Sequence, residues 1–123
     1  MREIKFRGRT PSGKWVYGDL HIRTIHPHIH TEPCSKAIID SDTVGQFTGF
    51  KDNTGKEIYE GDIVKFMAHD GLGNELGTQQ GIIRYQYGGY LIGGCDMYDI
   101  LLNDDEAEII GNIHDNPELL KSL

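Results

Sequence analysis

Histidine and glutamate recur at every second position between residues 26 and 32. An extended chain would place His26, His28, His30 and Glu32 on one face, and imidazole nitrogens and carboxylates are ordinary zinc ligands. Along a flat strand, however, positions i to i+4 are spread over about 13 Å, whereas zinc needs bonds of about 2.1 Å. One strand therefore offers two ligands at most without a partner strand or a subunit symmetry axis. The sequence favours an exposed polar face and leaves these four residues as metal candidates.

Residues 8–14 read GRTPSGK, which matches a phosphate-binding loop up to its last position. Trp15 stands where such a loop needs the hydroxyl that holds magnesium, and Pro11 removes one backbone donor. A strand rather than a helix is expected to follow, so no helix N-terminus would face a phosphate. We therefore predict a hairpin turn here and no bound cofactor.

The basic residues Lys5, Arg7 and Arg9 share one face of the first expected strand. They could contact phosphates or an acidic partner, but the chain carries 12 basic and 19 acidic residues, a net charge of −7. Binding to a phosphate backbone is driven by counterion release and normally requires a basic protein. A nucleic-acid partner is therefore disfavoured, and a solvated face is expected. The serines and cysteines form no nucleophile–histidine pattern, so no catalytic residue is assigned.

Short strands and tight turns must position these residues, because glycine is abundant and helical periodicity is weak. The 16 glycines among 123 residues are nearly twice the average share of about 7 %. Alternating apolar and polar positions predict strands over residues 3–9, 15–22, 36–40, 46–50, 57–59, 62–66, 81–87, 90–92 and 107–113. We expect a glycine loop over residues 70–77, a two-residue turn at Gly88 and Gly89, and one short helix after Asn116 and Pro117. The predicted fold class is mainly β, a small antiparallel barrel.

Two stretches repeat the same order of turn residues. Residues 6–19 contain Phe-x-Gly, Ser-Gly-Lys and Tyr-Gly-Asp, and residues 47–62 contain Phe-x-Gly, Thr-Gly-Lys and Tyr-Glu-Gly-Asp. The second copy has one more residue in the turn and one more before Gly-Asp. We predict two similar hairpins, each ending in a Gly-Asp bend whose aspartate accepts local backbone N–H groups. The residues assigned to this structural role are Gly8, Gly18, Asp19, Gly49, Gly61 and Asp62.

The stretch from residue 45 to residue 64, GQFTGFKDNTGKEIYEGDIV, resembles the hallmark of the YopX family of bacteriophage and prophage proteins. The opening REIKFRG of residues 2–8, WVYGDL of residues 15–20 and IIGNIHDNPELL of residues 109–120 are similar to the same family. Residues 23–36 and 67–80 lie outside the pattern. The resemblance implies an SH3-type barrel with hairpin extensions and one short C-terminal helix, and it carries no catalytic residues over. It also implies a single domain over residues 1–123, with an N-terminal hairpin region at 1–59 and a barrel region at 60–123.

Three functions follow from the sequence as hypotheses. The leading one is a non-enzymatic accessory protein of a phage or prophage that binds another protein, phage- or host-encoded, and whose sheet edges also allow a homo-oligomer. The first alternative is a metal-binding hydrolase that uses His26, His28 and His30. The second is a nucleic-acid-binding protein that uses the basic N-terminal strand. The charged N-terminus and the lack of a long apolar run predict a cytoplasmic location in a bacterial host, with no membrane partner.

Overall fold

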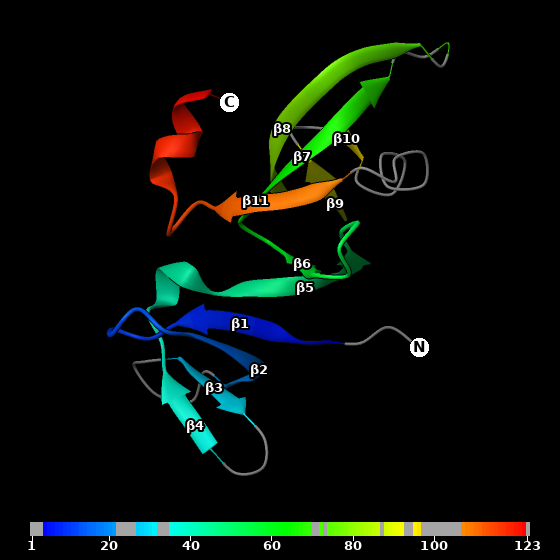
Figure 1. Cartoon of the computed structure of the whole chain (residues 1–123). Coiled ribbons are helices and arrows are strands. Elements are labelled where there is room, and N and C mark those ends of the chain that lie inside the picture. The colour runs from blue at the N-terminus through cyan, green and yellow to red at the C-terminus, as the bar shows by residue number, and fades with distance from the viewer. Residues whose placement is uncertain are drawn as a thin grey trace. The chain divides into compact units, whose positions relative to one another are not determined.

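The structure is a computed structural model that describes residues 4–21, 27–31, 35–69, 72, 74–86, 88–92, 95–96 and 107–122. Within these ranges the chain consists of strands and two short 3-10 helices (Figure 1). The strands form two sheets, and every described strand pairing is antiparallel. The predicted mainly β class is therefore confirmed. The chain divides into two compact units, Met1–Gly49 and Phe50–Leu123, which are described one at a time.

The first unit contains four strands, a 3-10 helix and the start of a fifth strand. These are β1 (Phe6–Arg9), β2 (Trp15–His21), β3 (His28–Thr31), β4 (Ser35–Ile38), η1 (Ser41–Thr43) and β5 (Gly45–Lys51). The strand order is β4-β3-β2-β1-β5, and β6 (Glu57–Tyr59) follows β5 at the end of this sheet. Ile29 and Ile39 are almost fully buried. Gly8 lies so close to Ile39 that a Cβ there would collide with that side chain.

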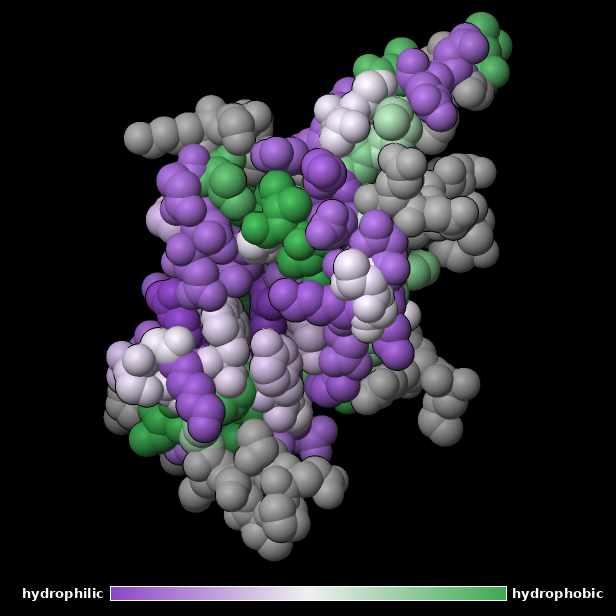
Figure 2. Space-filling model, in the orientation of Figure 1, coloured by the Kyte–Doolittle hydropathy of each residue, from purple (hydrophilic) through white to green (hydrophobic). Residues whose placement is uncertain are grey.

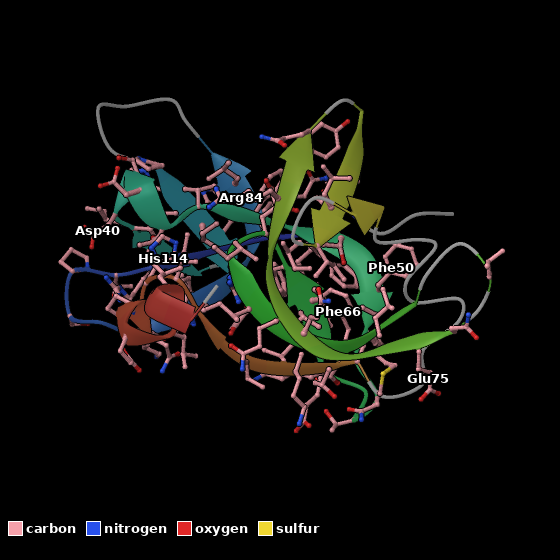
Figure 3. The ribbon with its side chains drawn as sticks, turned by 90° about the horizontal axis from the view of Figure 1, so that it is seen from above. Asp40, Phe50, Phe66, Glu75, Arg84 and His114 are labelled. Atoms are coloured by element: carbon pink, nitrogen blue, oxygen red, sulfur yellow. The ribbon has the colours of Figure 1, made fainter. Side chains whose placement is uncertain are left out.

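The second unit contains the rest of β5, six further strands and a 3-10 helix. These are β6 (Glu57–Tyr59), β7 (Asp62–His69), β8 (Glu75–Gln86), β9 (Gly89–Ile92), β10 (Cys95–Asp96), β11 (Glu108–Asn112) and η2 (Pro117–Ser122). The second sheet has the order β10-β9-β8-β7-β11. Its core consists of Ile58, Val64, Phe66, Ile83, Tyr90, Ile92 and Ala107, with Phe50, Ala68 and Ile109 packed against it. Figure 3 shows Phe50 and Phe66 on the side of the sheet toward which β8 and β9 curve.

Three predicted boundaries differ from the observed elements. The loop expected over residues 70–77 is shorter, because β8 already begins at Glu75 and pairs with β7. The β8–β9 turn lies one residue earlier than predicted, since Gln86 pairs with Gly89 and the turn glycine is Gly88, with φ of 81°. The helix predicted at the C-terminus is the 3-10 helix η2.

The two hairpins predicted from the sequence repeat share one turn geometry. In the first turn, the Thr10 N–H donates to the Lys14 carbonyl (2.9 Å) and the Gly13 N–H donates to the Thr10 carbonyl (2.8 Å). In the second turn, Asp52 takes the place of Thr10, and the corresponding distances are 2.9 Å and 3.0 Å. Gly13 and Gly55 have φ of 90° and 87°. The turns have equal length, so the extra residue of the second copy lies in β5, before the turn, and not in the turn as predicted.

The carboxylate of Asp52 holds the second turn together and ties it to β11. Its Oδ1 accepts hydrogen bonds from the Thr54 N–H, the Thr54 hydroxyl and the Lys56 N–H at 2.9, 2.6 and 2.9 Å. Its Oδ2 accepts a fourth from the Ile109 N–H at 3.1 Å. Burial by itself would raise the pKa of Asp52, but the hydrogen bonds from Thr54, Ile109 and Lys56 outweigh it and lower the pKa below the usual 3.8.

The Gly-Asp pair at residues 61–62 forms the turn between β6 and β7. Gly61 has φ of 90°, a conformation that favours glycine. Its N–H donates to the Ile83 carbonyl of β8 at 3.0 Å, and its carbonyl accepts from the Ile113 N–H at 2.9 Å. The Asp62 carboxylate is buried and accepts a hydrogen bond from the Tyr59 N–H at 2.8 Å. Gly61 therefore links the β6–β7 turn to β8 and to the residue that follows β11.

The Gly-Asp pair at residues 18–19 differs from the prediction. Gly18 and Asp19 lie inside β2, which continues to His21, so this copy contains no bend. Gly18 has φ of 153°, and a Cβ at this position would collide with the His30 carbonyl of β3. Glycine is needed here for the close approach of a neighbouring strand. Asp19 is exposed and pairs in register with His30.

Asparagines close the turn between β11 and η2. The Asn112 side-chain oxygen accepts from the backbone N–H groups of His114 and Asp115 at 3.0 and 2.9 Å. The Asn116 oxygen reaches back to the Asn112 N–H at 3.2 Å. A Cβ on Gly111 would lie 2.6 Å from that oxygen, so only glycine fits there without a shift.

We expect Asp62→Ala to lower the free energy of unfolding by about 1–3 kcal/mol, because it leaves the buried Tyr59 N–H without its carboxylate acceptor. Asp19→Ala is the matched control, since it removes the aspartate of the other Gly-Asp copy from an exposed site and should change stability by less than about 0.5 kcal/mol. Urea unfolding of both variants provides the comparison. Equal losses in the two would show that Asp62 has no special structural role.

The lowered pKa of Asp52 predicts a specific pH dependence of stability. The ionised carboxylate stabilises the folded state above the unfolded pKa, and this contribution is lost as the pH falls through the lower folded pKa. Asp52→Asn should therefore be less stable than the unmodified chain at pH 7, and the gap should narrow toward about pH 2. Urea unfolding across this range, with the exposed Asp42→Asn as control, measures the gap. A gap that stays constant with pH would contradict the assignment.

Candidate functional site

The phosphate-loop-like segment of residues 8–14 connects two paired strands. Arg9 in β1 faces Trp15 in β2, and the five residues between them form the turn described above. Because β2 begins directly after Lys14, the backbone N–H groups here serve a hairpin rather than a helix start. The predicted hairpin turn is confirmed at this position.

Of the four metal candidates, the structure describes two. His28 and His30 lie in β3, two residues apart, with His28 half-buried and His30 exposed. His26 and Glu32 lie outside the described residues. In the described part of the chain, no group of three or more His, Cys, Asp or Glu side chains is arranged to hold a metal ion. Two of the four candidate residues, His28 and His30, therefore occupy alternate positions of one described strand.

Lys5, which precedes β1, and two arginines of β1, Arg7 and Arg9, lie against aromatic rings of the first unit. The Lys5 ammonium is 5.4 Å from the centre of the Phe47 ring, and the Arg7 guanidinium is 4.6 Å from that of Trp15. The Arg9 guanidinium lies 6.0 Å from the same Trp15 ring. Arg7 is only 6 % exposed, which differs from the solvated face expected for this stripe. A cation over an aromatic face is attracted by the ring quadrupole, so these contacts stabilise the sheet.

The β7–β8 hairpin extends beyond the rest of the second sheet. β11 pairs with β7 at positions 62–65, and β9 pairs with β8 at Ile83 and the three residues that follow it. Residues 66–69 of β7 and 75–80 of β8 lie beyond these pairings: residues 66–69 pair within residues 75–79, and Gln80 pairs with Lys65. We call this two-stranded extension the arm. Figure 1 shows it in green, projecting from the sheet.

The β8 strand of the arm is exposed, and apolar side chains lie toward the tip. Every residue of β8 from Glu75 to Gln80 is exposed. Leu72 at the tip is 89 % exposed and Leu76 is 59 % exposed, and Figure 2 shows hydrophobic surface along this projection. The register shifts between Ala68 and His69, so Leu76 is an extra residue of β8, followed by Gly77 with φ of 103°. Figure 3 labels Glu75 near the start of this strand and Arg84 farther along it.

Sequence reasoning missed the first half of β8. Residues 75–80 read ELGTQQ and contain no alternation of apolar and polar residues, so they give no strand signal. Pairing with β7 makes them a strand. It also missed that Asp19 and His21 of β2 are the register partners of His30 and His28 of β3, because only the strand pairing makes them neighbours.

Within the described residues, no helix has the length and hydropathy needed to cross a bilayer.

Comparison with known proteins identifies a family and similar solved structures. The family model described as YopX protein matches residues 6–121. The crystal structure of protein EF1440 from Enterococcus faecalis is similar, with a TM-score of 0.63 and 27 % sequence identity over 98 % of this chain and 99 % of that one. The comparison with curated proteins gives no match. Because the family model covers nearly the whole chain, this chain belongs to the YopX family.

Proposed function

We propose that this chain is a non-enzymatic, protein-binding β module of a bacteriophage or prophage that works in the cytoplasm of the bacterial host. Its binding element is the arm, which receives an extended segment of a partner protein along β8. The observation that carries the proposal is the exposed segment of β8 at residues 75–80, which projects with β7 beyond the positions where β9 pairs with β8. The five antiparallel strands of the second sheet suit the SH3-type barrel that the family resemblance implies.

The composition of the arm favours strand addition. Natural sheet edges usually carry charges or prolines that prevent further pairing. In the arm, β8 carries one charge, Glu75 at its start, and residues 76–80 read LGTQQ, with neither a charge nor a proline. An extended peptide that pairs with such an edge gains backbone hydrogen bonds, and its alternate side chains can contact exposed apolar groups such as Leu76. The arm therefore offers both an edge and an apolar contact.

The charge distribution indicates the chemistry of the partner. Residues 1–49 contain seven basic and five acidic residues, a balance of +2, whereas residues 50–123 contain five basic and fourteen acidic residues, a balance of −9. The arm belongs to the acidic unit. An acidic surface attracts basic partners and speeds their association at low ionic strength. The partner segment is therefore extended and basic.

The test uses prolines in the arm. Successive N–H groups of a strand point to opposite sides, so one of Thr78→Pro and Gln79→Pro removes a donor facing β7 and the other removes a donor on the outer edge. The immobilised full chain is used to capture proteins from infected host cells, and the captured protein is then purified and its affinity measured. The proline variant that keeps the melting temperature should bind the partner at least about tenfold more weakly, because it blocks the outer edge.

Leu120→Asp is the control, because Leu120 is 40 % exposed in η2, outside the arm, and its replacement should leave binding unchanged. Raising the salt concentration from about 0.1 M to about 0.5 M should weaken binding of a basic partner. The proposal fails if both proline variants fold and bind the captured protein as the unmodified chain does. It also fails if capture is lost equally in Leu120→Asp.

A further inference from the structure

The hairpin formed by β1 and β2 lies in a segment that carries only positive charge. Residues 4–18 contain four basic residues, Lys5, Arg7, Arg9 and Lys14, and no acidic residue. Fourteen of the nineteen acids of the chain belong to residues 50–123. Counterion release depends on the phosphates that nearby cations contact. The net charge of the whole chain therefore does not determine what this hairpin binds.

The strand register places two aromatic rings beside the arginines of β1. Arg7 is the register partner of Tyr17, and Arg9 is the register partner of Trp15. Directly opposed residues of an antiparallel pair lie on the same face, with Cβ atoms about 4.5–5.5 Å apart. The guanidinium carbons of Arg7 and Arg9 lie 4.6 and 6.0 Å from the centre of the Trp15 ring. We call Arg7, Arg9, Trp15 and Tyr17 the basic aromatic face.

The exposure of this side of the first sheet increases from β5 toward β2. Phe47 of β5 is 4 % exposed and Arg7 of β1 is 6 % exposed, whereas Tyr17 of β2 is 47 % exposed. Trp15 and Arg9 are half-buried. A ligand can therefore reach Tyr17 most easily, with Trp15 and Arg9 next to it. The buried Arg7 acts as a positioning residue, because its contact with the Trp15 ring helps to fix that ring.

We propose that the basic aromatic face binds single-stranded nucleic acid. An unpaired base stacks on an exposed aromatic ring, and this contact is sequence-tolerant because every base has a π-face. Tyr17 supplies the first ring, and Trp15 supplies a second, two residues away on the same side of β2. The neighbouring phosphates are attracted by Arg9 and by the exposed Lys14. A duplex binds less well, since its bases are stacked on each other.

The combination of rings and cations favours nucleic acid over an acidic protein. An acidic peptide is attracted by the cations but has no need of the two rings, whereas a nucleic acid strand is anionic and aromatic along its whole length. Asp19 limits the affinity, because it is exposed and lies two residues beyond Tyr17 on the same side of β2. The proposed face belongs to the first unit and is independent of the arm, which belongs to the second.

The probe is a fluorescein-labelled oligothymidylate of about 15 nucleotides, mixed with the full chain and followed by fluorescence anisotropy. At about 50 mM salt we expect a Kd of about 1–100 μM. Tyr17→Leu should weaken binding by at least about fivefold, and Tyr17→Phe should keep the affinity, because stacking needs the ring and not the hydroxyl. Tyr85→Leu is the matched control, since Tyr85 is a 54 % exposed tyrosine of the second unit and its replacement should leave binding unchanged.

Two charge variants give readouts that a purely structural role would not change. Lys14→Gln should weaken binding and reduce the slope of log affinity against log salt by about 0.7, the value expected for one lost phosphate contact. Asp19→Asn should strengthen binding, because it removes the negative charge from this side of β2. Unlabelled oligothymidylate should displace the probe, whereas polyglutamate with the same number of charges should not.

The proposal is overturned if the anisotropy does not change up to about 0.5 mM protein, well above the expected Kd. It is also overturned if Tyr17→Leu keeps its melting temperature and binds as the unmodified chain does, or if Tyr85→Leu loses as much affinity. Equal displacement by polyglutamate would overturn it as well, because the face would then bind acidic protein segments by charge alone.

Discussion

The buried carboxylate of Asp52 is the contact on which the arrangement of the second unit depends. A carboxylate removed from water is costly unless hydrogen bonds replace its hydration, and Asp52 accepts four. Three of them close a hairpin turn, and the fourth reaches across 57 positions of sequence to the Ile109 N–H of β11. The Asn53 N–H adds a bond to the Ala107 carbonyl at 2.9 Å. One turn therefore positions the strand that completes the edge of the second sheet beside β7.

Comparison of the two hairpin turns shows why the second needs an acid. Both turns direct a side-chain oxygen at the N–H of the lysine four residues later, from the Thr10 hydroxyl at 3.1 Å and from Asp52 Oδ1 at 2.9 Å. A hydroxyl has a single oxygen, and Thr10 shares it with Ser12 at 2.8 Å. A carboxylate has a second oxygen that remains available for another strand. The substitution of an acid for threonine converts a local turn into a long-range connection.

The sequence predicts those parts of the fold that local patterns specify. Apolar alternation marks β7 and β9, and Gly-Lys turns mark both hairpins, because strand period and positive φ are encoded within a few residues. The first half of β8 escapes prediction, since its polar residues become a strand only through pairing with β7. The relation of His21 to His28 escapes it for a similar reason. Cross-strand register is a property of two segments, and no spacing within either segment contains it.

The motifs that carry the family resemblance include residues that stabilise the turns of the fold. Gly61, Asp62, Gly111 and Asn112 all make or permit backbone contacts at turns. Residues 23–36 and 67–80, which none of the motifs recognised in the sequence includes although the family model spans them, contribute β3 and most of the arm. The fold still determines what these segments can do. A slip of one residue would turn every side chain of a strand to the opposite face. Gly18 helps to prevent such a slip between β2 and β3, because only a residue without a Cβ lets the His30 carbonyl approach so closely. A glycine assigned to bending the chain thus fixes which residues face the histidines of β3.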